Sequence, residues 1–354
     1  MSRLLNGLIE PSPPPPDDFA EDHIGSIGHR SYLPFILTPY TDKMTLWQKM
    51  DNWFLSGCLR YSIMNALEQG ARNFFREIHG DDSLVDGCYA NVSLTMRLSN
   101  FIYNYPQLLG PNVIELGPLH IKEPGKLPQN IQDWLDGAEK GVVYFSLGSN
   151  MKSKSLPQSV RENFLKFFRE LPPGYRVLWK WELDGKIPGQ SDNILGQKWA
   201  PQPSVLAHPK VKVFITQGGL QSFQEAVHYG VPTVGIPWFA DQEHNVAKMV
   251  DAGIGSSIQP PELYSYEKIK SALETVLYDE REFTSQSHDK AVFWIEHVAK
   301  FGGAPHLRPS TADATLFEYF CFDILAVILV FILTVLYVTK LVLRIFVSRI
   351  VSFS

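Results

Sequence analysis

The sequence has few cysteines, few charged residues and no excess of positive charge. Three of its 354 residues are cysteine (Cys58, Cys88 and Cys321), too few for a disulfide framework and without metal-ligand spacing. We therefore expect buried or membrane-edge thiols. Charged residues make up 19% of the chain and the formal net charge is -5, which argues against nucleic-acid binding.

Other common features are also missing. Met1–Glu10 has no apolar core long enough for a signal peptide, and Pro11–Pro16 holds five prolines, a stiff extended linker. The sequence shows no internal repeat. Its first α/β strand ends in Phe145–Asn150, which is not the Gly-x-Gly-x-x-Gly turn of a nicotinamide dehydrogenase, so that reading of the α/β pattern fails.

One long apolar run stands near the end of the chain. Ile324–Val338 is apolar throughout except for Thr334. With Tyr319–Phe322 added, the run is long enough to cross a bilayer, and Asp323 alone opposes it. We predict a transmembrane helix over residues 319–338 and a short basic cytosolic tail over 339–354. A buried amphipathic helix is the alternative.

Strand and helix signals alternate from Asn130 onwards and predict a doubly wound α/β domain over residues 129–309. Its predicted strands are Val142–Leu147, Tyr175–Trp181, Ile194–Trp199, Val213–Thr216, Val231–Pro237 and Ile254–Ile258; its predicted helices are Leu156–Leu171, Leu220–Gly230, Tyr266–Tyr278 and Glu280–Val298. Before it come an irregular Pro-rich segment (1–27), a partial domain (28–117) and a Pro/Gly/Lys linker (118–128). The partial domain combines a helix over Asp42–Phe75 with strands over Ser83–Thr95 and Val113–Leu116.

The most informative stretch is Val213–Asn245. A strand ends in Gln217–Gly219, and a helix follows at once. The two glycines allow a ligand to approach the backbone, and the N–H groups at the helix start suit a phosphate. The next strand, Val231–Pro237, leads to a polar loop at Asp241–Asn245. Ligands of open parallel sheets bind beyond the carboxyl ends of the strands, where all these polar residues fall.

This stretch resembles the donor-binding signature of the membrane-bound animal UDP-glycosyltransferases. The resemblance rests on Trp199–Gln202, the Gly-Gly turn, Glu225, Gly230–Pro232 and Asp241–Asn245, in that order. It extends from about Gly28 to the C-terminal tail, with Leu37–Met44 a close match. It implies a GT-B-like α/β fold with a complete C-terminal Rossmann-like donor domain, a partial N-terminal acceptor-binding domain and a C-terminal transmembrane helix. The first part of a full-length member has no counterpart in this chain.

The resemblance also implies roles for individual residues. Trp199 would stack on uracil, with a core tryptophan as the alternative. Gln202 would bond the nucleoside and Glu225 the ribose hydroxyls, unless Glu225 is an ordinary surface carboxylate. Asp241 and Gln242 would bond the sugar. The donors for the diphosphate would be Ser149, Gln217, Gln221 and the N–H groups of Gly218 and Gly219. Many members have His at the position of Gln217 and Asn at the position of Gln221; both substitutions keep a hydrogen-bond donor, but the positive charge that a histidine can carry is lost.

The catalytic residues stay unassigned, because the family's His base and its Asp partner lie in the part without a counterpart. His29 is interpreted as a loop histidine. No Asp-x-Asp motif is present, so we expect no metal ion and no cofactor, with the UDP-sugar as co-substrate. The expected partners are a small lipophilic acceptor and the membrane, with homo- or hetero-oligomers left open.

Two functions follow from the resemblance. The first is an inverting UDP-glycosyltransferase of the detoxification type that transfers a hexose or hexuronic acid. The second is a catalytically inactive form that binds UDP-sugar or a full-length partner. The expected location is the endoplasmic reticulum membrane, single-pass, with a lumenal body if a signal peptide precedes Met1.

Overall fold

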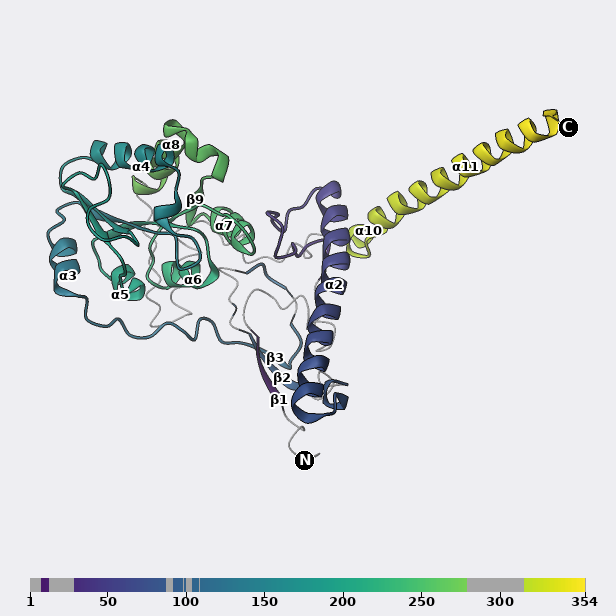
Figure 1. Ribbon diagram of the computed structural model, residues 1–354, viewed down its shortest axis with the longest axis horizontal. Helices are drawn as coiled ribbons and strands as arrows, with labels where there is room; N and C mark the ends of the chain where they lie inside the picture. Colours follow the sequence, from purple (N-terminus) through teal and green to yellow (C-terminus); the bar gives the residue numbers. More distant parts are fainter. Residues whose placement is uncertain are drawn as a thin grey trace.

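The structure is a computed structural model, and it describes residues 8–12, 29–86, 92–97, 99, 104–107, 109–278 and 315–353. Cys88, the predicted helix over 280–298 and the predicted domain end at residue 309 lie outside these residues. Figure 1 shows a rounded α/β domain, a long helix (α2) beside a small sheet, and a C-terminal helix (α11) that extends away from both.

The rounded domain is built on a six-stranded sheet in which every neighbouring pair is parallel. Its strands are β4 (Gly141–Ser146), β5 (Tyr175–Lys180), β6 (Ile194–Gln197), β7 (Val211–Thr216), β8 (Thr233–Gly235) and β9 (Gly255–Ser257). The spatial order is β6-β5-β4-β7-β8-β9. The chain therefore runs outward from β4 to β6 and then returns to the other side of β4. This order confirms the predicted doubly wound α/β domain, and it places the topological switch between β4 and β7.

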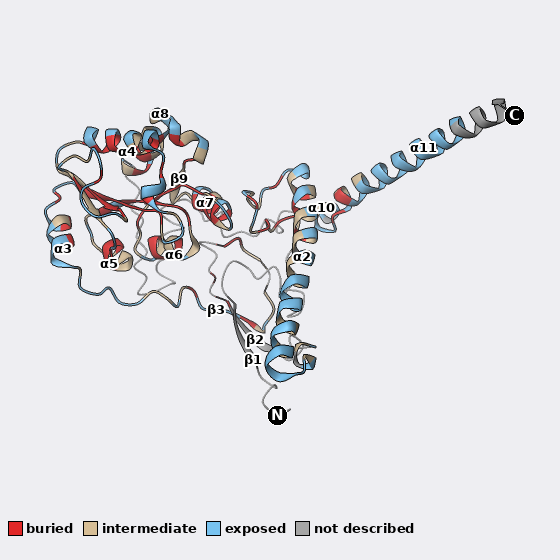
Figure 2. Ribbon diagram, in the orientation of Figure 1, coloured by how far each residue is buried: buried red, intermediate tan, exposed pale blue. Residues whose placement is uncertain are grey.

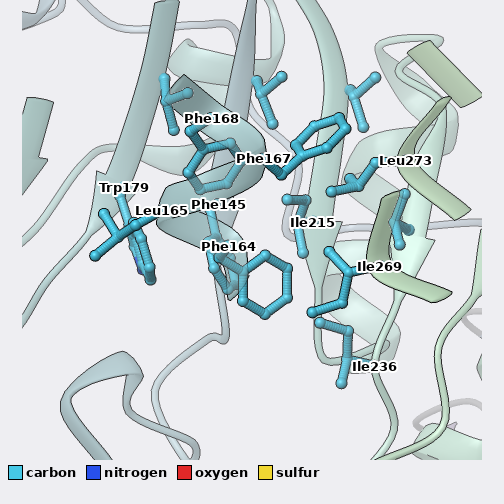
Figure 3. Close-up of a cluster of buried hydrophobic side chains, with 14 of the residues drawn as sticks. Phe145, Phe164, Leu165, Phe167, Phe168, Trp179, Ile215, Ile236, Ile269 and Leu273 are labelled. Carbon is cyan, nitrogen blue, oxygen red and sulfur yellow. The ribbon is translucent and has the colours of Figure 1, made fainter. Parts of the chain in front are cut away.

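Alternate side chains of β4 enter two separate cores, as the two-residue period of a strand requires. Phe145 packs with Phe164 and Phe168 of α4 (Gln158–Glu170), and its ring lies 4.6 Å from that of Trp179. Figure 3 shows this aromatic cluster together with the side chains of α8 (Tyr266–Leu277). All six residues of β4 are buried, which is typical of a central parallel strand covered on both faces.

The other face of the sheet is covered by α3 (Gln129–Asp136), α5 (Gln202–Leu206) and α6 (Leu220–His228). Tyr144 stacks on Phe214 at this face, with ring centroids 5.1 Å apart. The helix α7 (Gln242–Asp251) packs on α6 through Val246 and Met249. Neither α3, α5 nor α7 was predicted. The prediction of a polar loop at Asp241–Asn245 is wrong, because four of these five residues belong to the first turn of α7.

The N-terminal part contains a three-stranded parallel sheet in the order β1-β2-β3. Its strands are β1 (Leu8–Ser12), β2 (Val92–Arg97) and β3 (Val113–Glu115). The strand β1 corrects the expectation of an irregular segment over residues 1–27, since Pro11 sits in an edge strand, where a missing N–H is tolerated. The predicted strand over Ser83–Thr95 begins too early, because Ser83–Val85 forms a 3-10 helix. The predicted helix is α2 (Leu46–His79), capped by Thr45 and ended by Gly80 at φ 70°.

The base of the C-terminal helix is attached to α2. The short helix α10 (Leu316–Tyr319) leads into α11 (Phe322–Phe353). Lys49 of α2 is 4.0 Å from both Glu318 and Asp323, and its side chain is only 10% exposed. Asp323, the one charge that opposed the predicted membrane span, therefore lies beside a cation. Among the described residues, Phe322–Ile345 is the segment long and apolar enough to cross a membrane. Figure 2 shows most of it exposed, with buried residues only at its base beside α2.

Candidate donor-binding site

The candidate site lies at the carboxyl ends of β4 and β7, where the strand order reverses. The loop after β4 carries Gly148 and Ser149, and the loop after β7 carries Gln217–Gly219. The two strands pair in register up to Ser146 and Thr216, so the two loops leave the sheet side by side. A ligand at this edge would meet both loops and the start of α6.

The Gly-Gly turn is fixed by α7. Gly218 has φ 81°, and a Cβ on it would lie 2.4 Å from a methyl of Val246. Asn245 Nδ2 donates to the Gly218 carbonyl at 2.9 Å, and the Gly218 N–H donates to Thr216 Oγ1 at 3.3 Å. The Gly218 N–H, one of the predicted phosphate donors, thus has a contact within the protein. Glycine is required here for packing against α7 and for its backbone angle.

The start of α6 retains unused donors. Gly219 is its N-cap residue, and within the described part of the chain no side chain caps the helix or engages the N–H groups of its first turn. Gln221 is exposed in this turn, and Ser149 is exposed on the facing loop. Gln217 is only 6% exposed, and its Oε1 atom has no hydrogen-bond partner among the described residues. A Cβ at Gly148 would lie 2.6 Å from Gln217 Nε2, so this carboxamide fills the space between the loops.

The carboxylate of Glu225 is buried and held from two sides. It is 7% exposed, which excludes the alternative of an ordinary surface carboxylate. Gln202 Nε2 donates to Glu225 Oε2 at 2.7 Å, and His120 Nε2 lies 3.5 Å from Glu225 Oε1. Burial raises the pKa of Glu225, while the hydrogen bond from Gln202 and the nearby His120 act in the opposite direction.

Trp199 follows the strand β6 and Lys180 ends β5, on the opposite side of β4 from β7. Trp199 is 70% exposed, so it is not a core tryptophan. The ammonium of Lys180, at the end of β5, lies 5.1 Å from the centre of the Trp199 ring. The same ammonium donates to the Gly148 carbonyl at 2.5 Å. Burial lowers the pKa of Lys180, and the residue brings a positive charge to the loop that follows β4.

Asp241 and Gln242 lie at the start of α7, where both already have protein partners. Asn245 Nδ2 donates to Asp241 Oδ2 at 2.8 Å. Gln242 is 2% exposed, and its Oε1 accepts the backbone N–H groups of Trp238 and Phe239 at 2.9 and 3.3 Å. Ala240, directly before them, has φ 57°, a strained backbone angle for a residue with a side chain. The position of Asp241 and Gln242 is therefore set by the loop that ends at Ala240 and by their own hydrogen bonds.

Three histidines have contacts of their own in the described part of the chain. His29 Nε2 bonds the Tyr319 carbonyl at 2.6 Å, at the base of α11. His208 Nε2 lies 3.1 Å from Asp136. His244 is buried beside Tyr105, and burial lowers its pKa to about 4. None of the three meets Glu225, Gln221 or Trp199 through a contact within the described chain.

Comparison with known proteins decides the family. The family model described as UDP-glucoronosyl and UDP-glucosyl transferase matches residues 14–354, nearly the whole chain. The chain belongs to this family. UDP-glycosyltransferase UGT5 of Dactylopius coccus is 33% identical over 349 residues, which cover 92% of this chain and 64% of that protein. UDP-glucuronosyltransferase 2B18 of Macaca fascicularis is 32% identical over 331 residues, covering 87% of this chain and 60% of that protein.

This UDP-glycosyltransferase family member thus spans less than two thirds of the length of the curated relatives it matches. Among solved structures, the glycotransferase of kitacinnamycin aligns with a TM-score of 0.46 and 21% identity, over 61% of this chain and 55% of that one. A UDP-glucosyltransferase from Polygonum tinctorium aligns with a TM-score of 0.44 and 20% identity, over 54% and 46%.

Two residues of this family member's site were not found from the sequence. His120 lies in a segment interpreted as a linker, and Lys180 ends a strand without belonging to a motif. A signal was present for Lys180, since a lysine at the carboxyl end of a parallel strand lies on the ligand-binding edge. His120 could not be found in this way, because nothing local to it indicates Glu225, 105 positions later in the numbering.

Proposed function

We propose that the chain binds a UDP-sugar at this edge and transfers a hexose or hexuronic acid to a small lipophilic acceptor. The observation that carries the proposal is the buried carboxylate of Glu225, held by Gln202 and His120 beside an uncapped helix start. A buried carboxylate is costly unless it has partners, and a ribose diol supplies two hydroxyl donors to it. Family membership and the exposed Trp199 support the same reading.

In this proposal the donor lies across the switch point. Uracil stacks on Trp199, the ribose bonds Glu225, and the diphosphate lies against Ser149, Gln221 and the free N–H groups that start α6. The sugar reaches Asp241 and Gln242. Gln217 carries no positive charge, and Lys180 supplies one instead. Its ammonium bonds the Gly148 carbonyl and so lies beside the loop that would contact the diphosphate.

The proposed transfer inverts the anomeric carbon and uses no metal ion. The acceptor oxygen attacks from the face opposite the UDP leaving group, and a base takes its proton as the new bond forms. The N–H groups at the start of α6 and the Lys180 ammonium stabilise the diphosphate charge that develops as the old bond breaks. Metal independence is supported by the sequence, which has no Asp-x-Asp motif.

A second candidate is binding of the donor without transfer. It is favoured by the positions of His29, His208 and His244, which are engaged elsewhere in the described part of the chain. The proposed location is the endoplasmic reticulum membrane, supported by α11 and by the family.

Calorimetric titration of the full chain in detergent with UDP tests the donor site. Glu225→Ala is expected to weaken UDP binding at least tenfold, since each hydrogen bond to a charged group contributes about 1.5–3 kcal/mol. Glu139→Ala is the matched control, because Glu139 is exposed before β4, at the opposite end of the sheet. Equal UDP affinity of the wild type and Glu225→Ala would refute the site.

A second assay separates the two candidates. The full chain is incubated with a UDP-sugar and a phenolic acceptor, and release of UDP is followed with and without a chelator. Turnover that survives the chelator, with inverted product by NMR, supports transfer. UDP binding without turnover supports the second candidate.

A further inference from the structure

The linker between the two halves of the chain lies against the candidate site. In Figure 1 it runs from β3 beneath α6 and α5 to α3. The Tyr229 hydroxyl donates to the Lys122 carbonyl at 3.4 Å, at the end of α6. A Cβ on Gly125 would be 3.9 Å from Ser204 Oγ of α5. The segment interpreted from sequence as a spacer is therefore seated on the helices that carry Gln202 and Glu225.

His120 and Glu225 face each other without completing a hydrogen bond. His120 Nε2 lies 3.5 Å from Glu225 Oε1, and this ring nitrogen is buried with no hydrogen-bond partner among the described residues. The other carboxylate oxygen of Glu225 is occupied by Gln202 at 2.7 Å. Oε1 and Nε2 thus lie within ion-pair distance of each other but are too far apart for a short hydrogen bond.

A hydroxyl group fits this pair chemically. It donates its proton to a carboxylate oxygen and accepts an N–H with a lone pair at the same time. The Glu225 carboxylate favours the ring form that carries the proton on Nε2, since that form places an N–H opposite the negative charge. A ribose offers such hydroxyls, whereas a deoxyribose lacks one of them.

We propose that His120 is a direct ribose contact, in which its Nε2–H donates to the ribose hydroxyl that Glu225 accepts. This inference rests on the proposed UDP-sugar function and extends it. It makes the linker part of the donor site, and it assigns to His120 the selection of ribonucleotides over deoxyribonucleotides. A histidine that only fastened the linker would affect every nucleotide equally.

The test is a comparison of UDP with 2′,3′-dideoxy-UDP by calorimetry on the full chain in detergent. We expect His120→Ala to weaken UDP binding about fivefold to tenfold and dideoxy-UDP binding by less than about twofold, as loss of one hydrogen bond to ligand predicts. His120→Gln retains an N–H donor and is expected to recover part of the UDP affinity. His208→Ala, which removes the other His–carboxylate pair at 3.1 Å, is the matched control and should bind both ligands like the wild type.

Equal weakening of both ligands by His120→Ala, or no weakening of either, would overturn the inference. Thermal unfolding of each variant identifies any variant that does not fold, and His120→Gln then carries the comparison. If Glu225→Ala weakens UDP binding and His120→Ala does not, the role of His120 is refuted while the proposed donor site stands. A wild type that binds no UDP refutes the proposed function and, with it, this inference.

Discussion

Val246 of α7 is enclosed by two glycines, and this arrangement makes a quantitative prediction. A Cβ on Gly235, at the end of β8, would lie 2.5 and 2.8 Å from the two Val246 methyl groups. Val246 is only 1% exposed and packs against Phe223 of α6, so it cannot move into solvent. Gly235→Ala should therefore overpack this contact and lower the free energy of unfolding by about 1–3 kcal/mol.

The companion substitution should partly reverse this loss. Val246→Ala alone removes two buried methyl groups and is expected to cost about 2 kcal/mol, including the cavity. In Gly235→Ala/Val246→Ala the new methyl occupies part of that cavity, so the pair should be about 1–2 kcal/mol more stable than the sum of the single changes. Gly218→Ala should not be rescued equally well, because its φ of 81° disfavours any side chain.

The measurement is denaturant unfolding of the full chain in detergent, followed by the fluorescence of the buried Trp179 and Trp181. Gly57→Ala is the control, since a Cβ there meets nothing within 4 Å and lies inside α2. We expect no loss of stability from it. Strict additivity of Gly235→Ala and Val246→Ala would show that the two residues do not share this space, and would refute the overpacking explanation for Gly235.

Two further predictions concern buried charges. Because the folded-state pKa of Glu225 is raised, its ionisation removes stability as the pH increases, so Glu225→Gln should raise the free energy of unfolding near neutral pH. This gain should vanish below the ordinary carboxyl pKa of 4.5, and a gain independent of pH would contradict it. Lys49→Met should lower the free energy of unfolding by about 1–3 kcal/mol, because Asp323 loses its cation. The double variant Lys49→Met/Asp323→Asn should recover part of that loss. A double variant no more stable than Lys49→Met would exclude the pairing.

The sequence predicted the central strands well, for a simple physical reason. β4 and β7 are short apolar runs bounded by turn residues, and burial on both faces leaves few other structures for them. The search for apolar runs did not find α7, because most of its residues are polar. His244, Asn245 and Lys248 are nevertheless almost fully buried, because tertiary partners satisfy or enclose them. No local pattern reveals such partners.

The residues of the candidate site also fall into two groups, those that sequence motifs predict and those that only the fold reveals. Trp199, Gln202 and Glu225 were located by their spacing and order, and the structure brings Gln202 and Glu225 into contact. The function of Gly218 in packing depends on Val246, which lies beyond the next strand. His120 depends on how a linker is folded back onto α6. Contacts between distant segments are decided by the whole fold, so single motifs do not predict them.

The attachment of α11 to α2 rather than to the six-stranded domain bears on how the two substrates would arrive. Lys49 and the loop at His29 hold the base of α11, and Figure 1 shows the six-stranded domain on the far side of α2. In the proposed function, the half nearest the bilayer is the one that takes the lipophilic acceptor. Such a molecule partitions into the membrane, so its effective concentration beside α2 would exceed that in bulk water. The water-soluble nucleotide sugar would instead be supplied from the aqueous phase, at the domain held away from the lipid.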